Sequence, residues 1–345
     1  MVAAVPSEKK IIVVIGGSGM VGGSVARSLH DNSDFWVRLT TLDTTTTRAK
    51  RLVDQGFEVI KADSWSPQEL DVAFQGAYGV FLNTDSDDPN FKNEIGPPES
   101  AMGKIVIDAA MRQGVKHFVF SGLPEAKKLT NGEVSILSFD NKNAIANYGR
   151  KAGFASFVEV NIGWAMDIFW MEAYGKAFGG FATIPDSEGF LTLKLFPMPN
   201  QPERIPWTSV RDDYGDAVHA VFLDPTSYDK RTIWAISDYM GFQDVADAYN
   251  SVTGTQTARF VPDFEPLKAA TPGKTKEVNG LRNYCNYIKG DYCNGQPTDE
   301  NLVKENRRLK EIASRARGRT GAEAQLQTIK GFIQAYGPVK LENKL

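Results

Sequence analysis

The chain has 345 residues, of which 42% are hydrophobic, and a formal net charge of −3. This composition is that of a globular protein with a large core. The small acidic excess argues against direct binding to nucleic acid, which normally needs a concentrated basic face. No signal peptide and no run of about 20 apolar residues is visible, so we expect a soluble, cytoplasmic protein without membrane contact. Cys285 and Cys293 lack the number and spacing of a disulfide framework or a zinc site, and we expect free thiols and no bound metal.

An apolar run near the N-terminus ends in three glycines spaced three residues apart. The segment IIVVI (11–15) predicts a parallel strand buried on both faces, and a helix is expected to begin near Met20. Between them, Gly16 permits a tight turn, Gly19 lets the backbone approach a pyrophosphate, and Gly22 allows close packing of helix and strand. Because the turn follows a strand and opens a series of strand and helix units, it predicts a dinucleotide-binding site rather than a plain connector.

Strand and helix signals alternate through the first half of the chain. Helix-length intervals separate six apolar strands, predicted at 11–15, 35–41, 57–63, 78–84, 116–122 and 156–162. This alternation predicts an α/β fold with a Rossmann-type, doubly wound parallel sheet covered by helices on both faces. Ligands of such sheets bind at the carboxyl ends of the strands, so the residues just after each strand are the candidates for the site.

The pattern loosens in the second half, which is rich in glycine, proline and aromatic residues. The segment FPMPNQPERIPW (196–207) favours irregular structure rather than a second regular sheet. We therefore expect an NAD(P)-binding domain over 1–165 and a smaller, mixed cap or substrate subdomain over 166–345, partly interleaved with it. The basic segment 304–319 has helical spacing and interspersed acids, which favours a solvated helix face over a partner-binding patch.

The second strand ends in Thr41, Leu42 and Asp43, where Rossmann proteins distinguish NAD from NADP. A carboxylate at Asp43 can bind ribose hydroxyls and would repel a 2′-phosphate, whereas Arg48 and other basic residues close behind favour a phosphate. Asp43 can equally serve only as a turn or helix cap. The sequence leaves the choice between NAD(H) and NADP(H) open.

Polar residues also follow the third and fourth strands. Asp63 and Ser64 can meet the adenine, and Asn83 and Thr84 can border the ribose and nicotinamide. Each of these side chains can instead cap the helix or turn that comes next. Their place at the functional edge of the sheet favours the binding role.

Lys142 is the candidate for chemistry. Ser138 or Asp140 can start its helix and Gly153 can end it, which predicts Lys142 in the first helical turn at the cleft mouth. An ammonium is unfavourable near the positive end of a helix dipole unless it has oxygens to bind. Ribose hydroxyls or a neighbouring acid would supply them, and a solvated surface lysine is the alternative.

Four segments resemble the NmrA-like family of atypical short-chain dehydrogenases, which includes an NADPH-sensor branch and isoflavone-type reductases. They are IGGSGMVGGSV, QGFEVIKADSWS, FQGAYGVFLNT and SGLPEAKKLTNGEVSILSFDNKNAIANYGRKAGF, and the resemblance is good over about 8–170 and fades past 255. It implies that Lys142 matches the lysine that reductases use in catalysis. It also implies cofactor contacts from Gly16, Gly17, Ser18, Gly19, Met20, Val21, Gly22, Asp63, Ser64 and Thr84, and at the nicotinamide end from Gly163, Trp164, Met166 and Asp167.

Two positions depart from the family pattern. Leu42 stands where sensor-type members carry an arginine for the 2′-phosphate, and Ser138 stands where standard short-chain dehydrogenases carry the catalytic tyrosine. A serine hydroxyl is a poor proton donor for carbonyl reduction, although isoflavone-type reductases also lack the tyrosine. We expect an NAD(P)(H)-binding oxidoreductase, with NADP(H) implied by the family and NAD(H) open, that acts on a small molecule. The alternative is a redox-sensing regulator that binds a protein partner, and the oligomeric state stays open.

Overall fold

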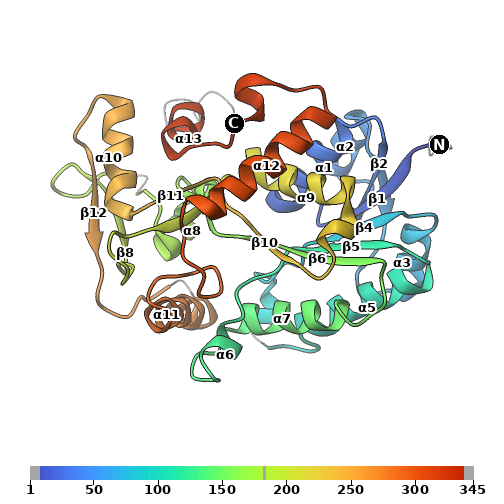
Figure 1. Ribbon diagram of the computed structural model, residues 1–345. Helices are drawn as coiled ribbons and strands as arrows, with labels where there is room; N and C mark the ends of the chain where they lie inside the picture. The colour runs from blue at the N-terminus through green and yellow to red at the C-terminus, as the bar shows by residue number, and fades with distance from the viewer. Residues whose placement is uncertain (1–7, 93, 182–183, 270, 338–345) are drawn as a thin grey trace.

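A seven-stranded parallel sheet forms the centre of the molecule (Figure 1). The computed structural model describes residues 8–92, 94–181, 184–269 and 271–337. The strand order is β10-β6-β5-β4-β1-β2-β3, and the direction of winding reverses between β1 and β4. The strands are β1 (Lys10–Ile15), β2 (Phe35–Thr41), β3 (Glu58–Lys61), β4 (Gly79–Leu82), β5 (His117–Phe120), β6 (Ser156–Ile162) and β10 (Thr232–Ala235).

The six predicted strands are confirmed, and the sheet contains a seventh that the sequence did not indicate. Strand β10 comes from the second half and pairs in parallel with β6, from Thr232 opposite Glu159 to Ala235 opposite Ile162. Its four residues follow α9 (Gly215–Leu223) and a short 3-10 helix (Pro225–Tyr228).

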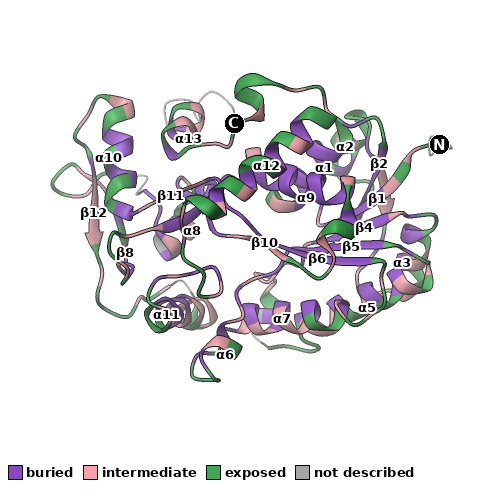
Figure 2. Cartoon of the chain, in the orientation of Figure 1, coloured by how far each residue is buried: buried purple, intermediate pink, exposed green. Residues whose placement is uncertain are grey.

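Helices cover both faces of the sheet (Figure 1). One layer contains α1 (Met20–His30), α2 (Thr47–Asp54), α9 (Gly215–Leu223) and α12 (Glu300–Ala316), and the other contains α3 (Pro67–Phe74), α5 (Glu99–Arg112) and α7 (Leu137–Gly149). Successive side chains of a strand point to opposite faces. In β1, Ile12 and Val14 accordingly join one hydrophobic core, and Val13 and Ile15 join the other. The central strands of the sheet are buried (Figure 2). Because all strands run parallel, their carboxyl ends lie along one edge of the sheet.

The second half contains two small sheets that the sequence did not predict, although residues 196–204 of the proline-rich segment are irregular as expected. Strands β7 (Trp164–Ala165), β9 (Ile205–Thr208) and β11 (Asp238–Met240) form one, and β8 (Leu191–Leu195) pairs with β12 (Ala258–Pro262) in the other. Strand β9 lies within the proline-rich segment that argued against it, and Pro206 pairs opposite Tyr239. The remaining elements are α4 (Pro89–Lys92), α6 (Ala126–Leu129), a 3-10 helix (Met166–Ile168), α8 (Glu172–Phe178), a π-helix (Val210–Tyr214), α10 (Phe242–Thr253), α11 (Pro272–Tyr287), a 3-10 helix (Gly321–Ala324) and α13 (Ile329–Tyr336).

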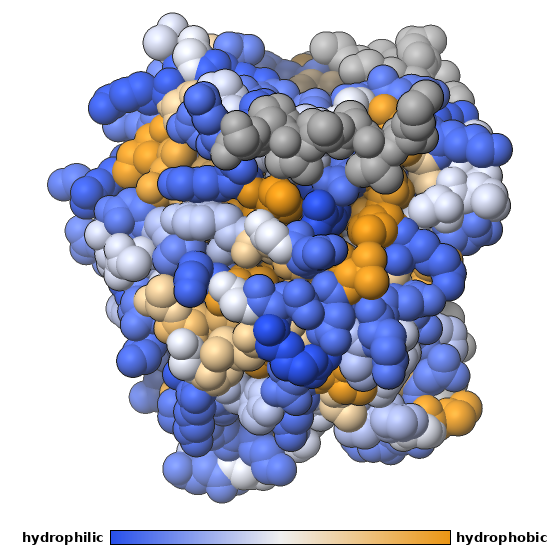
Figure 3. Space-filling view, turned by 90° about the vertical axis from the view of Figure 1, so that its right-hand side faces the viewer, coloured by the Kyte–Doolittle hydropathy of each residue, from blue (hydrophilic) through white to orange (hydrophobic). Residues whose placement is uncertain are grey.

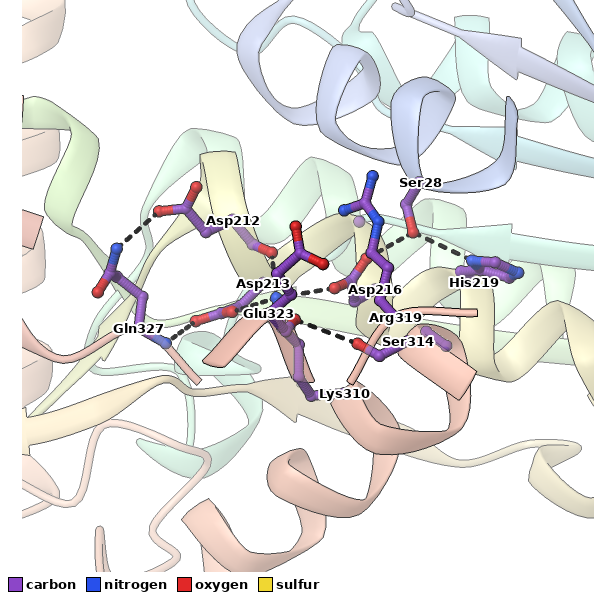
Figure 4. A network of polar contacts seen from close by, with 12 residues as sticks. Ser28, Asp212, Asp213, Asp216, His219, Lys310, Ser314, Arg319, Glu323 and Gln327 are labelled. Atoms are coloured by element: carbon purple, nitrogen blue, oxygen red, sulfur yellow. Dashed lines mark hydrogen bonds and ion pairs between the residues drawn. The ribbon is translucent and has the colours of Figure 1, made fainter. Parts of the chain in front are cut away.

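Two basic residues of the segment 304–319 attach α12 to the rest of the fold, so the prediction of a solvated face holds for only part of the segment. Lys310 Nζ lies 2.9 Å from Asp213 Oδ1 and 2.8 Å from Asp216 Oδ2, and all three side chains are buried. Arg317 Nη2 lies 2.7 Å from the same oxygen of Asp216. Figure 4 shows this polar network, in which the Ser28 hydroxyl donates to Asp216 and also contacts the ring of His219. Lys304, Arg307, Arg308 and Arg315 are exposed, as a solvated helix face predicts, whereas Lys310 and Arg317 join the buried network.

The side of the molecule that carries the N-terminus is mostly hydrophilic, with apolar residues gathered in separate patches (Figure 3). Among the helices of the described residues, none combines the length and the apolar character that crossing a membrane requires.

Candidate dinucleotide and active site

The glycine turn between β1 and α1 has the close contacts that its spacing predicted. Gly16 adopts a φ of +78°, a conformation that favours glycine. A Cβ on Gly22 would lie 2.3 Å from the carbonyl oxygen of Gly16, so only a glycine lets the helix approach the turn this closely. Gly19 is the N-cap of α1 and offers no side chain to its N–H groups. The helix therefore presents open donors to an anion, as a pyrophosphate site requires.

A groove runs beside this turn. Residues 17–20 and Arg48 line it on one side, and Asp167 and Arg211 come from the second half of the chain. The guanidinium of Arg48 donates to the carbonyl oxygen of Ser18. Basic side chains thus lie next to the expected phosphate position.

Asp43 and Asp63 both close local turns. Asp43 Oδ1 accepts hydrogen bonds of 2.7 Å from the backbone N–H and the hydroxyl of Thr45, and the bond from this hydroxyl is the main cause that lowers the pKa of Asp43. Asp63 Oδ1 accepts from the N–H of Trp65 at 2.9 Å. Leu42 is 66% exposed, and Ser64 is partly buried beside Asp63. These contacts fit the capping roles, and a nucleotide role for the four residues stays a prediction.

The end of β4 adjoins the glycine turn. A Cβ on Gly16 would lie 3.0 Å from the carbonyl oxygen of Asn83, which shows how closely the two segments approach. Thr84 follows and is buried. The turn after β1 and the residues after β4 therefore share one edge of the sheet, at the point where the winding reverses.

Lys142 lies at this same edge and is only 5% exposed, so it is not a solvated surface lysine. Its ammonium donates to the hydroxyl of Thr84 at 2.7 Å and to the Thr84 carbonyl at 3.0 Å, with the Ser121 carbonyl at 3.4 Å. Glu99 Oε1 lies 3.5 Å from Nζ. Burial lowers the pKa of Lys142, and the charge of Glu99 opposes this shift.

The start of the Lys142 helix differs from the prediction. Helix α7 begins at Leu137 with Ile136 as its N-cap, and neither Ser138 nor Asp140 caps it. Lys142 is therefore the sixth residue, in the second turn instead of the first. Asp140 is engaged by the hydroxyl of Ser135 instead.

Ser138 faces a carboxylate from the second half of the chain. Its hydroxyl donates to Glu277 Oε1 of α11 at 2.6 Å. Ser138, Glu277 and Glu99 line one pocket between the starts of α5 and α7 and helix α11. Ser138 thus lies at a junction of the two halves of the chain.

The segment from Gly163 to Asp167 lies where the second half meets the sheet. The side chains of Trp164 and Met166 are buried in the core, and the N–H of Gly163 donates to the Thr208 hydroxyl at 2.8 Å. Asp167 Oδ2 accepts from the Val210 N–H at 2.8 Å. Burial raises the pKa of Asp167 to about 6. Among these residues, Asp167 is the one whose side chain reaches the groove beside the glycine turn.

Sequence reasoning missed Glu99, Arg211 and Glu277. Glu99 has a weak signal, an acid in the first turn of a helix, but such acids commonly serve the helix dipole. Within the described residues no cluster of His, Cys, Asp and Glu has the arrangement of a metal site. Cys285 and Cys293 are free and buried, as expected for free thiols, and burial raises the pKa of both.

The reversal of winding, the glycine turn and the open start of α1 define a Rossmann-type protein of the dinucleotide-binding class. The sequence matches the model of the NmrA-like family over residues 8–312. It is 35% identical over 332 residues to the NmrA-like family domain-containing oxidoreductase lnaB of Aspergillus flavus, across 95% of this chain and 98% of that protein. It is 34% identical over 332 residues to the oxidoreductase FrzB of a Cladobotryum species, across 94% and 98%.

The chain belongs to the NmrA-like family, as its resemblance implied. The expectation that the similarity fades past residue 255 is wrong, because these alignments span nearly the whole chain. Crystal structures of NmrA, described as a negative transcriptional regulator, share the fold. The NAD complex aligns with a TM-score of 0.74 and 18% identity over 98% of this chain and 99% of that one. The NADP complex gives 0.73 and 18% over 98% of each chain.

Proposed function

We propose that this protein is an NAD(P)(H)-dependent oxidoreductase that reduces an activated C=C, C=N or carbonyl group of a small molecule. The observation that carries the proposal is the placement of Lys142 at the carboxyl edge of β4 and β5, beside the glycine turn. The family relatives named above as oxidoreductases support it. The dinucleotide supplies the hydride when it is bound.

Different residues of this chain would bind the different parts of the cofactor. The open start of α1 and the turn from Gly16 to Gly22 would hold the pyrophosphate, with Arg48 and Arg211 nearby. Asp63, Ser64, Asn83 and Thr84 follow the strands that border the adenosine and ribose positions of such a fold. NADP(H) is the cofactor that the family favours, and exposed Leu42 and cationic Arg48 fit either dinucleotide.

Lys142 is the candidate for proton transfer. Its ammonium is fixed by Thr84 and is the buried cation at this edge of the sheet. Ser138 supports a chemistry without the standard tyrosine, because its hydroxyl is already donated to Glu277. A lysine-assisted reduction does not need a phenol at that position.

The test is consumption of NADPH and NADH by the purified protein with a panel of enones, imines, quinones and aldehydes. We expect turnover with at least one member and its loss in Lys142→Met. If cofactor binding is confirmed and none of the panel is reduced, the enzymatic proposal fails.

A redox-sensing regulator is the second candidate, favoured by Ser138 in the place of the tyrosine. This function requires different affinities for the oxidised and reduced cofactor. Calorimetric titration with NAD, NADH, NADP and NADPH separates the two proposals. A large redox preference with a cofactor-dependent protein partner and no turnover supports the regulator, and equal affinities argue against it.

A further inference from the structure

Glu99 is the carboxylate that contacts the buried ammonium of Lys142. It is 1% exposed and stands at the first residue of α5. Its Oε1 accepts hydrogen bonds from the hydroxyls of Thr84 at 2.5 Å and Ser86 at 2.8 Å. Thr84 in turn accepts from Lys142 Nζ at 2.7 Å through the same hydroxyl oxygen. Lys142, Thr84 and Glu99 therefore form a closed triangle in which each member contacts the other two.

The triangle determines where the ammonium sits. The Thr84 hydroxyl has a single proton, which it donates to Glu99, so its lone pairs face Lys142. The backbone carbonyls of Thr84 and Ser121 take further ammonium protons. With Glu99 neutral, the Thr84 hydroxyl would lose its charged acceptor and the fixed orientation of this network.

The triangle also determines the charge of Lys142. Removal from water disfavours an ammonium, and an adjacent carboxylate restores it. Glu99 is the nearest opposing charge, and Asp85 and Glu159 add weaker attraction. Glu159 is itself committed to Arg150, which contacts it directly. Glu99 thus provides the largest single compensation for this buried cation.

The charged groups on the surrounding elements have other partners. On α11, Lys274 lies 3.1 Å from Asp87 and 3.6 Å from Glu277. Glu277 accepts from Ser138 of α7. Because these groups contact one another on the far side of the pocket, Glu99 remains the charge in direct contact with the ammonium of Lys142.

We propose that Glu99 is a positioning residue for the reaction, which keeps Lys142 as an ammonium and fixes it between the ends of β4 and β5. This inference rests on the proposed function, because it assigns to Glu99 the control of the lysine that serves the reduction. Glu99 acts through Lys142 and does not itself touch the reacting atoms.

The first experiment compares the pH dependence of kcat in the wild type, Glu99→Gln and Glu99→Asp. In Glu99→Gln the alkaline limb, which reports deprotonation of Lys142, moves down by about one pH unit or more, because burial is no longer opposed by the carboxylate. In Glu99→Asp the limb returns part of the way. An unchanged limb in Glu99→Gln overturns the proposal.

Glu58→Gln is the matched control. Glu58 forms another buried ion pair, with Arg38 Nε at 3.0 Å, between β2 and β3 and away from Lys142. Loss of this pair destabilises the fold, yet the alkaline limb stays where it is in the wild type. If Glu58→Gln moves the limb as far as Glu99→Gln does, general destabilisation explains the shift and the proposal fails.

The second experiment needs no turnover, so it separates failure of this inference from failure of the proposed function. Urea unfolding at pH 7 is compared for Glu99→Gln, Lys142→Met and the double variant. Glu99→Gln leaves a buried, uncompensated ammonium, and its folding constant falls at least about tenfold. The double variant removes the cation too and regains most of this loss. Strictly additive effects would show that the two residues are not coupled and would overturn the proposal.

Discussion

Two buried lysines in this protein have opposite electrostatic settings. Lys310 of α12 lies within 3 Å of two carboxylates, Asp213 and Asp216, and their charges outweigh burial and raise its pKa. Lys142 of α7 has one carboxylate, Glu99, at 3.5 Å, and burial prevails and lowers its pKa. Both lysines are nearly inaccessible, so burial alone does not distinguish a structural lysine from a functional one.

The number of contacting carboxylates makes the difference. Lys310 fastens a C-terminal helix to the π-helix and α9, as the network in Figure 4 shows. Lys142 instead binds hydroxyl and carbonyl oxygens at the carboxyl ends of strands, where a ligand is expected. A lysine with a lowered pKa in that position releases a proton more readily than one held by two carboxylates.

The largest effect on stability is expected for Lys310→Met. The change leaves Asp213 buried without its cation and Asp216 with Arg317 alone, which costs about 3–5 kcal/mol of the free energy of unfolding. Urea denaturation measures it, and exposed Lys304→Met on the same helix is the control. A loss no larger than that of the control would remove Lys310 from its structural role.

Lys142→Met is expected to affect mainly turnover, whereas Lys310→Met affects mainly stability. Turnover falls by a factor of about 10² to 10⁴, as for the loss of a proton-transfer group. The loss of stability is smaller than for Lys310→Met, because Glu99 keeps its bonds from Thr84 and Ser86. Exposed Lys151→Met, just after α7, is the control in assays of turnover and unfolding. Equal destabilisation by both buried-lysine variants would contradict the distinction.

Asp167 is a buried charged group at the groove beside the glycine turn, and it can be compared with the two lysines. Burial raises the pKa of its carboxyl to about 6. The pKa of Asp167 is higher in the folded protein than in the unfolded chain, where it is near 4. Its contribution to the free energy of unfolding is therefore present below pH 4 and is lost as the pH rises through 6. Asp167→Asn removes this loss and stabilises the protein above pH 6 by about 2–3 kcal/mol. Unfolding curves at pH 5 and pH 8 measure it, with exposed Asp54→Asn as control. An Asp167→Asn gain that is the same at both pH values would contradict the assignment.

His219 tests the structural role of the network around Lys310. Its ring contacts Ser28 and Asn32, and Ser28 donates to Asp216. Burial lowers the pKa of His219 to about 4. The pKa of His219 is lower in the folded protein than in the unfolded chain, where it is near 6.5. Its contribution to the free energy of unfolding is therefore present above pH 6.5 and is lost as the pH falls toward 4. About 2 kcal/mol should disappear between pH 6.5 and 5. His219→Gln should flatten this dependence in denaturation curves, whereas His30→Gln, an exposed control, should leave it intact.

The sequence predicted the elements whose signal is local. Six strands and the glycine turn follow from apolar runs and glycine spacing, and the position of Lys142 at the edge of the sheet follows from a basic residue near a helix start. The start of α7 was misplaced because Ser138 and Asp140 both offered cap oxygens. The structure commits the Ser135 hydroxyl to Asp140 and the Ser138 hydroxyl to Glu277.

Contacts between residues far apart in the chain could not be predicted from local sequence signals. Glu99 is 43 residues from Lys142, and Lys310 is 94 residues from Asp216. No periodicity links such positions, so Lys310 was interpreted as a solvated residue and Glu99 was overlooked. Strand β10 was missed for a similar reason, because its place is set by pairing with β6.

Binding of the dinucleotide tests the central claim most directly. Calorimetric titration of the wild type, Gly22→Ala and Gly23→Ala with the four nicotinamide dinucleotides separates a binding turn from a plain connector. A Cβ at Gly22 would lie 2.3 Å from the Gly16 oxygen, whereas one at Gly23 would lie 3.3 Å from its nearest atom, the Gly17 oxygen. We expect saturable binding by the wild type and Gly23→Ala, and binding weakened about tenfold or more in Gly22→Ala. Absence of binding to the folded wild type, or equal binding by all three proteins, would contradict the account.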